Sequence, residues 1–183
     1  MINLNYHKIE KTSIANGTGI RVVLWVSGCL LHCKGCHNPE TWDFNSGKLF
    51  DEEAKKELFE ALNKPYIQGI TFSGGHPLEL MNAKDVLNLI TEIRTKFPQK
   101  DIWLYTGYKL DINNFHCVCA ENSIEGTHHN LIAGILNLCD VIVDGMFVEE
   151  LKNITLKWKG SSNQRVIDVR KSIQQYKIVL YEQ

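Results

Sequence analysis

Short apolar runs alternate with amphipathic stretches along this chain. Residues 19–26 (GIRVVLWV) form a run that is rich in β-branched side chains and almost continuously apolar, which is typical of a strand buried on both faces. Similar runs at 69–72, 101–105 and 141–143 resemble it in length and composition. We therefore predict four buried strands at these positions.

The stretches between the predicted strands have the spacing of amphipathic helices. A helix over 51–62 begins with acidic residues, which the helix dipole favours at that end. A second helix, which Pro98 ends, is predicted by apolar residues at helical spacing: Val86, Leu89, Ile90, Ile93 and Phe97. A shorter helix is predicted over 131–138.

Strands that alternate with helices predict βαβ units, right-handed crossovers and a mostly parallel sheet. A closed eight-stranded β/α barrel takes about 250 residues, and this chain has 183. We therefore expect an α/β fold in which residues 1–183 form a single domain, an incomplete, open β/α barrel of mostly parallel strands. The irregular stretch 113–129 is expected to be a surface excursion, and two β-like runs in the tail, 154–156 and 177–180, have no predicted place.

Composition narrows the class of protein. The chain is 44% hydrophobic and 22% charged, which is typical of a globular protein. Twenty basic residues balance 21 acidic ones, so no charged patch indicates binding to nucleic acid or to a membrane surface. No apolar run approaches the ~18 residues of a membrane span, and the polar start does not resemble a signal peptide. We expect a soluble, cytoplasmic protein that binds neither nucleic acid nor membrane.

Each predicted strand ends in a cluster of small or polar residues. These clusters are SGC at 27–29, SGG at 73–75, TGY at 106–108 and DG at 144–145. In open α/β sheets and barrels, ligands bind outside the carboxyl ends of the strands. The four clusters are therefore expected to converge on one site.

The first cluster opens a group of three cysteines. Cys29, Cys33 and Cys36 have the spacing Cys-x3-Cys-x2-Cys, and three thiolates on one short loop can hold a single inorganic centre. On a [4Fe–4S] cluster they would leave one iron without a protein ligand, open to a substrate or cofactor. A structural zinc site completed by His32 or His37 is the alternative.

The other three cysteines, Cys117, Cys119 and Cys139, are interpreted as ordinary thiols kept reduced in the cytoplasm. A second metal site is the alternative, because further possible ligands lie near them in the sequence: His116, His128 and His129.

Several stretches, taken in order, resemble the radical S-adenosylmethionine superfamily, and within it the activating proteins of anaerobic ribonucleoside-triphosphate reductase. The resemblance extends from about residue 16 to about residue 170. The matching stretches are NGTGIR (16–21), VSGCLLHCKGCHN (26–38), TW (41–42), GITFSGG (69–75), KDIWLYTGYKL (100–110), VDG (143–145) and WKGSSNQR (158–165). The cysteine triplet alone is moderately specific, whereas its combination with the later stretches is highly specific.

The resemblance implies a radical enzyme. Cys29, Cys33 and Cys36 would hold one [4Fe–4S] cluster, and the amino and carboxylate groups of S-adenosyl-L-methionine would chelate its fourth iron. Reductive cleavage of that cofactor would give a 5′-deoxyadenosyl radical, which takes a hydrogen atom from a glycine of the anaerobic ribonucleoside-triphosphate reductase. The implied partners are this glycyl radical subunit and an electron donor such as flavodoxin or ferredoxin.

The resemblance also suggests cofactor contacts. It implies that Gly35 and His37 lie beside the cofactor and that Gly75 contacts it, with Ser73 and Gly74 in the same loop. Glycines let the backbone approach a ligand closely, and we expect unpaired N–H groups at Gly74 and Gly75, although a Gly-Gly pair is more often a plain turn. The strand-end residues Thr106 and Asp144 are further candidates to contact ribose or amino groups, with turn or cap roles as the alternative.

One position departs from the pattern of the family. The residue after Gly-Gly is usually acidic, which suits the positive amino group of S-adenosylmethionine, and here it is His76. A neutral histidine would lose the charge-assisted part of such a hydrogen bond. We predict that His76 keeps the place with weaker binding; the alternative is that backbone groups carry the contact and the side chain points elsewhere.

Two other functions remain open. The chain could activate a different glycyl radical enzyme, although the stretches at 100–110 and 158–165 favour the reductase. It could also be a zinc-stabilised binding module without catalysis.

Overall fold

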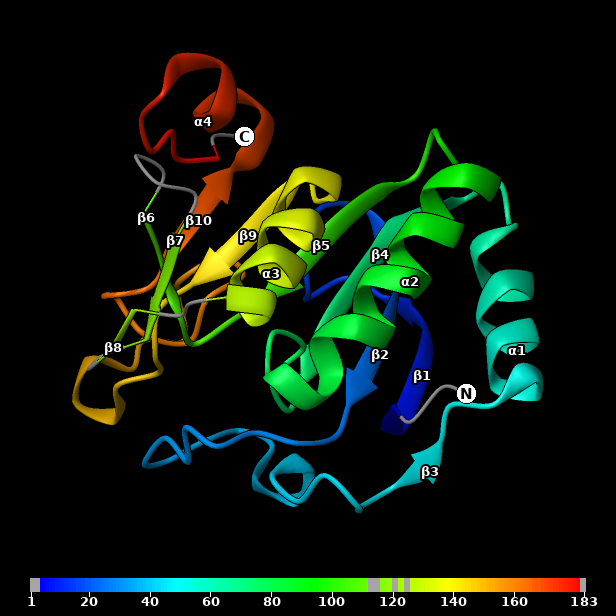
Figure 1. Cartoon of the computed structure of the whole chain (residues 1–183), viewed down its shortest axis with the longest axis horizontal. Helices are drawn as coiled ribbons and strands as arrows, with labels where there is room; N and C mark the ends of the chain where they lie inside the picture. Colours follow the sequence, from blue (N-terminus) through cyan, green and yellow to red (C-terminus); the bar gives the residue numbers. More distant parts are fainter. Residues whose placement is uncertain (1–3, 112–115, 120–121, 124–125, 182–183) are drawn as a thin grey trace.

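The computed structural model describes residues 4–111, 116–119, 122–123 and 126–181, with backbone alone for 116–119 and 122–123. Figure 1 shows one twisted sheet across the molecule, with helices packed against one of its faces. The strand order in this seven-stranded sheet is β10-β9-β5-β4-β2-β1-β3. Its strands are β1 (Asn5–Ser13), β2 (Ile20–Val26), β3 (Lys48–Leu49), β4 (Ile67–Gly74), β5 (Asp101–Tyr105), β9 (Val141–Asp144) and β10 (Arg165–Asp168).

The four predicted strands are the parallel centre of this sheet. Strands β2, β4, β5 and β9 pair in parallel, in the order β2-β4-β5-β9. Antiparallel strands cover both sides of this group, since β1 pairs with β2 and β10 pairs with β9. The sheet is open, so the predicted fold class, an α/β fold with an incomplete barrel of mostly parallel strands, is confirmed.

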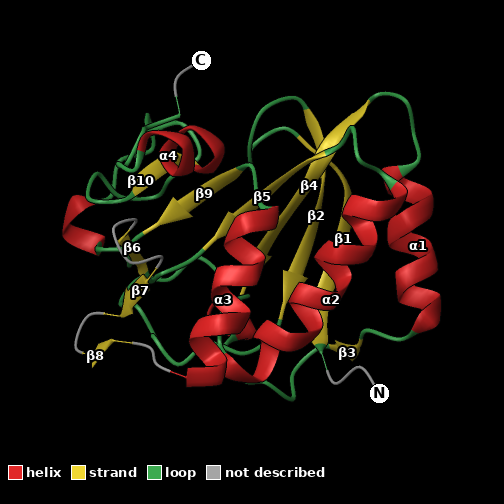
Figure 2. Ribbon diagram, turned by 45° about the horizontal axis from the view of Figure 1, so that its top comes forward, coloured by secondary structure: helices red, strands yellow, loops and turns green. Residues whose placement is uncertain are grey.

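The crossover helices are α1 (Glu52–Leu62), α2 (Leu80–Lys96) and α3 (Gly126–Leu138), and α4 (Val169–Gln175) follows β10. The side chain of Asp51 accepts a hydrogen bond from the amide of Ala54 and so caps α1. Helix α2 ends before Pro98, as predicted, but it begins six residues before the first periodic position, Val86. Figure 2 shows α1, α2 and α3 side by side over the sheet.

Alternate side chains of the central strands face two different environments. One set joins the aliphatic core under the helices, for example Leu24, Phe72 and Leu104, which are fully buried. The other set faces away from the helices and is more polar and aromatic: it includes Arg21, Trp25, Thr71, Ser73, Trp103 and Tyr105. The face without helices therefore carries the side chains that can serve a ligand.

Other segments differ from the sequence-based expectation. The N-terminal strand β1 and the C-terminal elements β10 and α4 were not predicted. The run 154–156 lies in turns, and the run 177–180 contributes one bridge, between Leu180 and Ile167. Part of the stretch 113–129 lies outside the described residues; the rest holds β7 (His116–Cys119), β8 (Asn122–Ser123) and the start of α3. The two strands form a small antiparallel sheet with β6 (Lys109–Asp111), which precedes this stretch. In the described ranges, no helix is long and apolar enough to cross a membrane.

Candidate functional site

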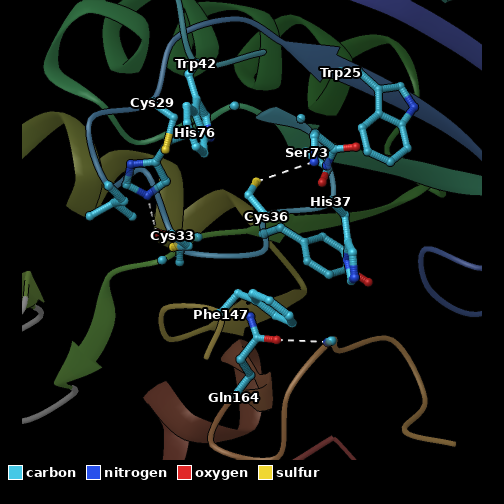
Figure 3. Close-up of a pocket in the computed structure, with 18 of the residues that line it drawn as sticks. Trp25, Cys29, Cys33, Cys36, His37, Trp42, Ser73, His76, Phe147 and Gln164 are labelled. Carbon is cyan, nitrogen blue, oxygen red and sulfur yellow. Dashed lines mark hydrogen bonds between the residues drawn. The ribbon is translucent and has the colours of Figure 1, made fainter. Parts of the chain in front are cut away.

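A cavity of about 230 Å³ lies at the carboxyl ends of the parallel strands. All four strand-end clusters contribute to its wall, which confirms that they converge (Figure 3). The predicted residues that line it are Cys29, Cys33, Cys36, His37, Ser73, Gly74, Gly75, His76 and Thr106. Two other predicted residues, Gly35 and Asp144, are absent from the lining.

The cysteine loop is held at its start by backbone hydrogen bonds. The amide of Gly28 donates to the carbonyl of Thr41 at 2.7 Å, and the amide of Cys29 donates to the carbonyl of Trp42 at 3.0 Å. Farther along, Lys34 forms ion pairs with Glu149 and Glu150 at 3.1 and 3.4 Å. The loop is therefore attached both to the segment that follows it and to the segment after β9.

Two thiols of the triplet resist ionisation in the protein alone. Burial raises the pKa of Cys29 to about 11 and also raises the pKa of Cys33. The third thiol, Cys36, accepts a hydrogen bond from the amide of Asn38 at 3.4 Å. Since metal ligation requires thiolates, iron that binds here must displace protons.

The three cysteines fit the ligand set of a [4Fe–4S] cluster. Their side chains line one cavity, and three thiols suit the three irons of such a cluster that need protein ligands. Among the residues whose placement is described, no group of three His, Cys, Asp or Glu side chains is arranged to hold a metal ion. The two histidines considered as zinc ligands lie against aromatic rings, His32 on Trp42 at 4.6 Å and His37 on Phe147 at 5.0 Å between centroids.

The Gly-Gly pair lets three chain segments meet. Gly74 has φ +100°, a conformation that favours glycine, and a Cβ at Gly75 would lie 2.6 Å from the carbonyl oxygen of Gly28 and 2.9 Å from that of Thr41. The expectation of an unpaired N–H at Gly75 is wrong. That amide donates to the carbonyl of Val26 at 2.7 Å, because the chain turns back onto the end of β2.

His76 lies in the cavity wall with both ring nitrogens in hydrogen-bond contact. Its Nε2 is 2.6 Å from the hydroxyl of Thr106, and its Nδ1 is 3.1 Å from the carboxylate of Glu79. Its amide donates to the carbonyl of Gly28 at 2.7 Å. The side chain is 2% exposed, so neither ring nitrogen is open to solvent.

Glu79 was missed by sequence analysis; it does not line the cavity, but it lies directly behind His76. Its buried carboxylate also accepts from the amide of Leu30 at 3.1 Å and from the hydroxyl of Tyr108 at 3.3 Å. Burial by itself would raise the pKa of Glu79, but the hydrogen bonds and the nearby imidazole of His76 outweigh burial and lower it. The signal in the sequence was the His-x-x-Glu spacing at the start of α2.

The remaining candidates lie elsewhere. Asp144 is fully buried, accepts from the amide of Leu110 at 2.8 Å and pairs with Arg165. Cys139 is buried in the core under the helices, and burial raises its pKa. The side chains of Cys117 and Cys119 lie outside the described residues. Further cavity residues received no role from the sequence, although most belong to the matching stretches: Asn16, Trp25, Asn38, Trp42, Tyr105, Phe147, Gly160 and Gln164.

Comparison with known proteins shows which family this chain matches. Residues 15–167 match the family described as "4Fe-4S single cluster domain". The chain is 42% identical over 169 residues to the anaerobic ribonucleoside-triphosphate reductase-activating protein of Escherichia coli, covering 91% of this chain and 100% of that protein. It is 41% identical over 164 residues to the protein of the same name from Enterobacteria phage T4, and 36% identical over 163 residues to that from Haemophilus influenzae. These alignments cover 89% and 88% of this chain, and 93% and 96% of the two relatives.

Proposed function

Because this chain belongs to the family of anaerobic ribonucleoside-triphosphate reductase-activating proteins and carries a 4Fe-4S single-cluster domain, we propose that it activates such a reductase by generating a glycyl radical on it. One observation carries the proposal beyond family membership: Cys29, Cys33 and Cys36 line the same cavity as the loops that end β4, β5 and β9. That arrangement supports the binding of a cluster and an organic cofactor side by side.

The residues would divide the work as follows. Cys29, Cys33 and Cys36 would hold the cluster, and the loop at Ser73–His76 with Thr106 would bind S-adenosylmethionine beside it. Bound there, these groups would supply the radical chemistry that removes a hydrogen atom from a glycine of the reductase. The fold brings the cysteine loop and the Gly-Gly loop into backbone contact, which orients the two groups relative to one another.

A zinc-stabilised module is the alternative, and one measurement separates it. After anaerobic reconstitution with iron and sulfide, the cluster protein should absorb broadly near ~400 nm and bleach with dithionite. Mössbauer spectra should show one iron that changes when S-adenosylmethionine is added. A colourless protein with stoichiometric zinc would contradict the proposal.

The activity itself is tested with the reductase. The reconstituted chain, S-adenosylmethionine and a reductant should yield 5′-deoxyadenosine and a glycyl radical that is visible by electron paramagnetic resonance on the reductase subunit. A second glycyl radical enzyme, incubated in parallel, tests the alternative substrate. A radical on that enzyme and none on the reductase would reassign the partner. As donor we propose a flavodoxin or ferredoxin, and as compartment the cytoplasm.

We expect that an acidic residue at position 76 strengthens cofactor binding. The change His76→Asp should lower the dissociation constant for S-adenosylmethionine, but alone it sets a second carboxylate beside Glu79, whose oxygen lies 3.1 Å from the present ring. The matched variant is therefore H76D/E79Q, with binding about tenfold tighter than in the wild type. Calorimetric titration of the oxidised holoprotein measures it, and an unchanged affinity would contradict the expectation.

A further inference from the structure

A row of three buried polar side chains runs from the start of α2 to the cavity. It consists of Glu79, His76 and Thr106, and all three residues are buried. The contacts are 3.1 Å from Glu79 Oε1 to His76 Nδ1 and 2.6 Å from His76 Nε2 to Thr106 Oγ1. Of the three, His76 and Thr106 line the cavity (Figure 3, where His76 is labelled).

Which group donates in each hydrogen bond of this row follows from the groups that can only accept. An ionised carboxylate only accepts hydrogen bonds, so Nδ1 of His76 carries a proton. In the ion pairs of the described residues, Glu79 has no lysine or arginine partner. With the ring neutral, Glu79 and His76 together carry one buried negative charge next to the cavity.

A neutral ring with its proton on Nδ1 accepts at Nε2, and the hydroxyl of Thr106 must then donate to it. The same oxygen accepts from the amide of Tyr108 at 3.0 Å. A hydroxyl has one proton and two lone pairs, so these two contacts leave one lone pair over. The bond from the Tyr108 amide to Thr106 and the two bonds of the row point in the same direction. Hydrogen bonds aligned in this way strengthen one another.

We propose that Glu79, acting through His76, sets the hydroxyl of Thr106 as an acceptor for a cationic N–H group in the cavity. Resting on the proposed function, that group is the α-ammonium of S-adenosylmethionine. Glu79 is thus a positioning residue: its negative charge lies behind the cavity wall and acts on the Thr106 hydroxyl through His76.

Glu79→Gln is the variant that removes the charge at the end of the row. In the wild type one oxygen, Oε1 of Glu79, accepts from the amide of Leu30 and faces Nδ1 of His76. The amide oxygen of glutamine can keep both contacts while its NH₂ group faces the hydroxyl of Tyr108. The row then loses the negative charge that polarises it, so the hydroxyl of Thr106 becomes a weaker acceptor. We expect the dissociation constant for S-adenosylmethionine to rise about tenfold, measured by calorimetry on the oxidised, reconstituted holoprotein, which does not turn over.

A double-mutant cycle separates this role from a structural one. T106V alone should raise the dissociation constant for S-adenosylmethionine about tenfold, whereas T106S should leave it unchanged. In the T106V background, E79Q should raise this constant by less than about twofold.

Three results would overturn the proposal: an equal loss from E79Q with and without T106V, wild-type affinity in T106V, or equal losses in T106S and T106V. The first would mean that Glu79 affects cofactor binding independently of Thr106. If E79Q does not retain the cluster, T106V against T106S decides. A wild-type protein that binds no cluster or no S-adenosylmethionine would instead contradict the proposed function, before any variant is made.

Discussion

Cys29→Ala should abolish 5′-deoxyadenosine formation. Cys29 is the most buried thiol of the triplet, and the hydrogen bond from its amide to the carbonyl of Trp42 fixes its backbone. With two anchors left, a second iron would lack a protein ligand, so both the cluster and its open iron would lose their defined geometry. Chromatography of the products after anaerobic incubation with dithionite and S-adenosylmethionine measures the loss.

The matched control for this variant is Cys139→Ala. Cys139 is equally a buried thiol, but it belongs to the core under the helices and does not line the cavity. C139A should retain iron, sulfide and cofactor cleavage, at a cost in stability of about 1 kcal/mol for the small void it leaves. Cofactor cleavage that persisted in C29A would exclude the proposed ligand set.

Gly75→Ala is expected to have the second largest effect. The added Cβ would lie within 3 Å of two backbone carbonyl oxygens, those of Gly28 and Thr41, and backbone cannot rotate away as a side chain can. Overpacking of this kind costs about 1–3 kcal/mol. The shift would be transmitted directly to Cys29, and misplacement by about 1 Å can reduce a rate 100-fold. Thermal unfolding and 5′-deoxyadenosine formation should both be measured.

Gly134→Ala provides the comparison. Gly134 lies inside α3, and the three atoms nearest to a Cβ there all belong to the flexible side chain of Leu87, the closest being its methyl groups at 3.2 Å. Alanine is the better helix former by about 1 kcal/mol, so this variant should be as stable as the wild type or more stable. If G75A and G134A had the same melting temperature and activity, the close backbone approach at Gly75 would not matter for either stability or cofactor cleavage.

The central strands could be predicted because each is an apolar run that needs burial on both faces. Strand β1 could not, since its nine residues are mostly polar and most are only partly buried. Its stability comes from pairing with β2, which no local pattern reveals. The C-terminal strand β10 is similar: four residues are too few for a periodicity, and its place is set by pairing with β9.

The candidate site also has features that the sequence predicts and features that it does not. Strand ends meet at one edge of a parallel sheet, so the convergence of 27–29, 73–75 and 106–108 followed from the order of elements. What could not be predicted was where each polar group finds its partner. The amide of Gly75 turns back to Val26, and the ring of His76 lies between Glu79 and Thr106. These hydrogen-bond partners depend on the exact path of the loops, which the sequence pattern does not specify.

The cavity wall draws on nearly the whole chain, from Asn16 to Gln164. The last of these residues is fixed late, because the Gln164 side chain donates to the carbonyl of Gly145 and accepts from the amide of Gly160. A nascent polypeptide still on the ribosome can therefore expose its three thiols well before the far wall exists. The cavity is therefore complete only once the chain has been synthesised beyond Gln164 and this segment has folded back onto Gly145.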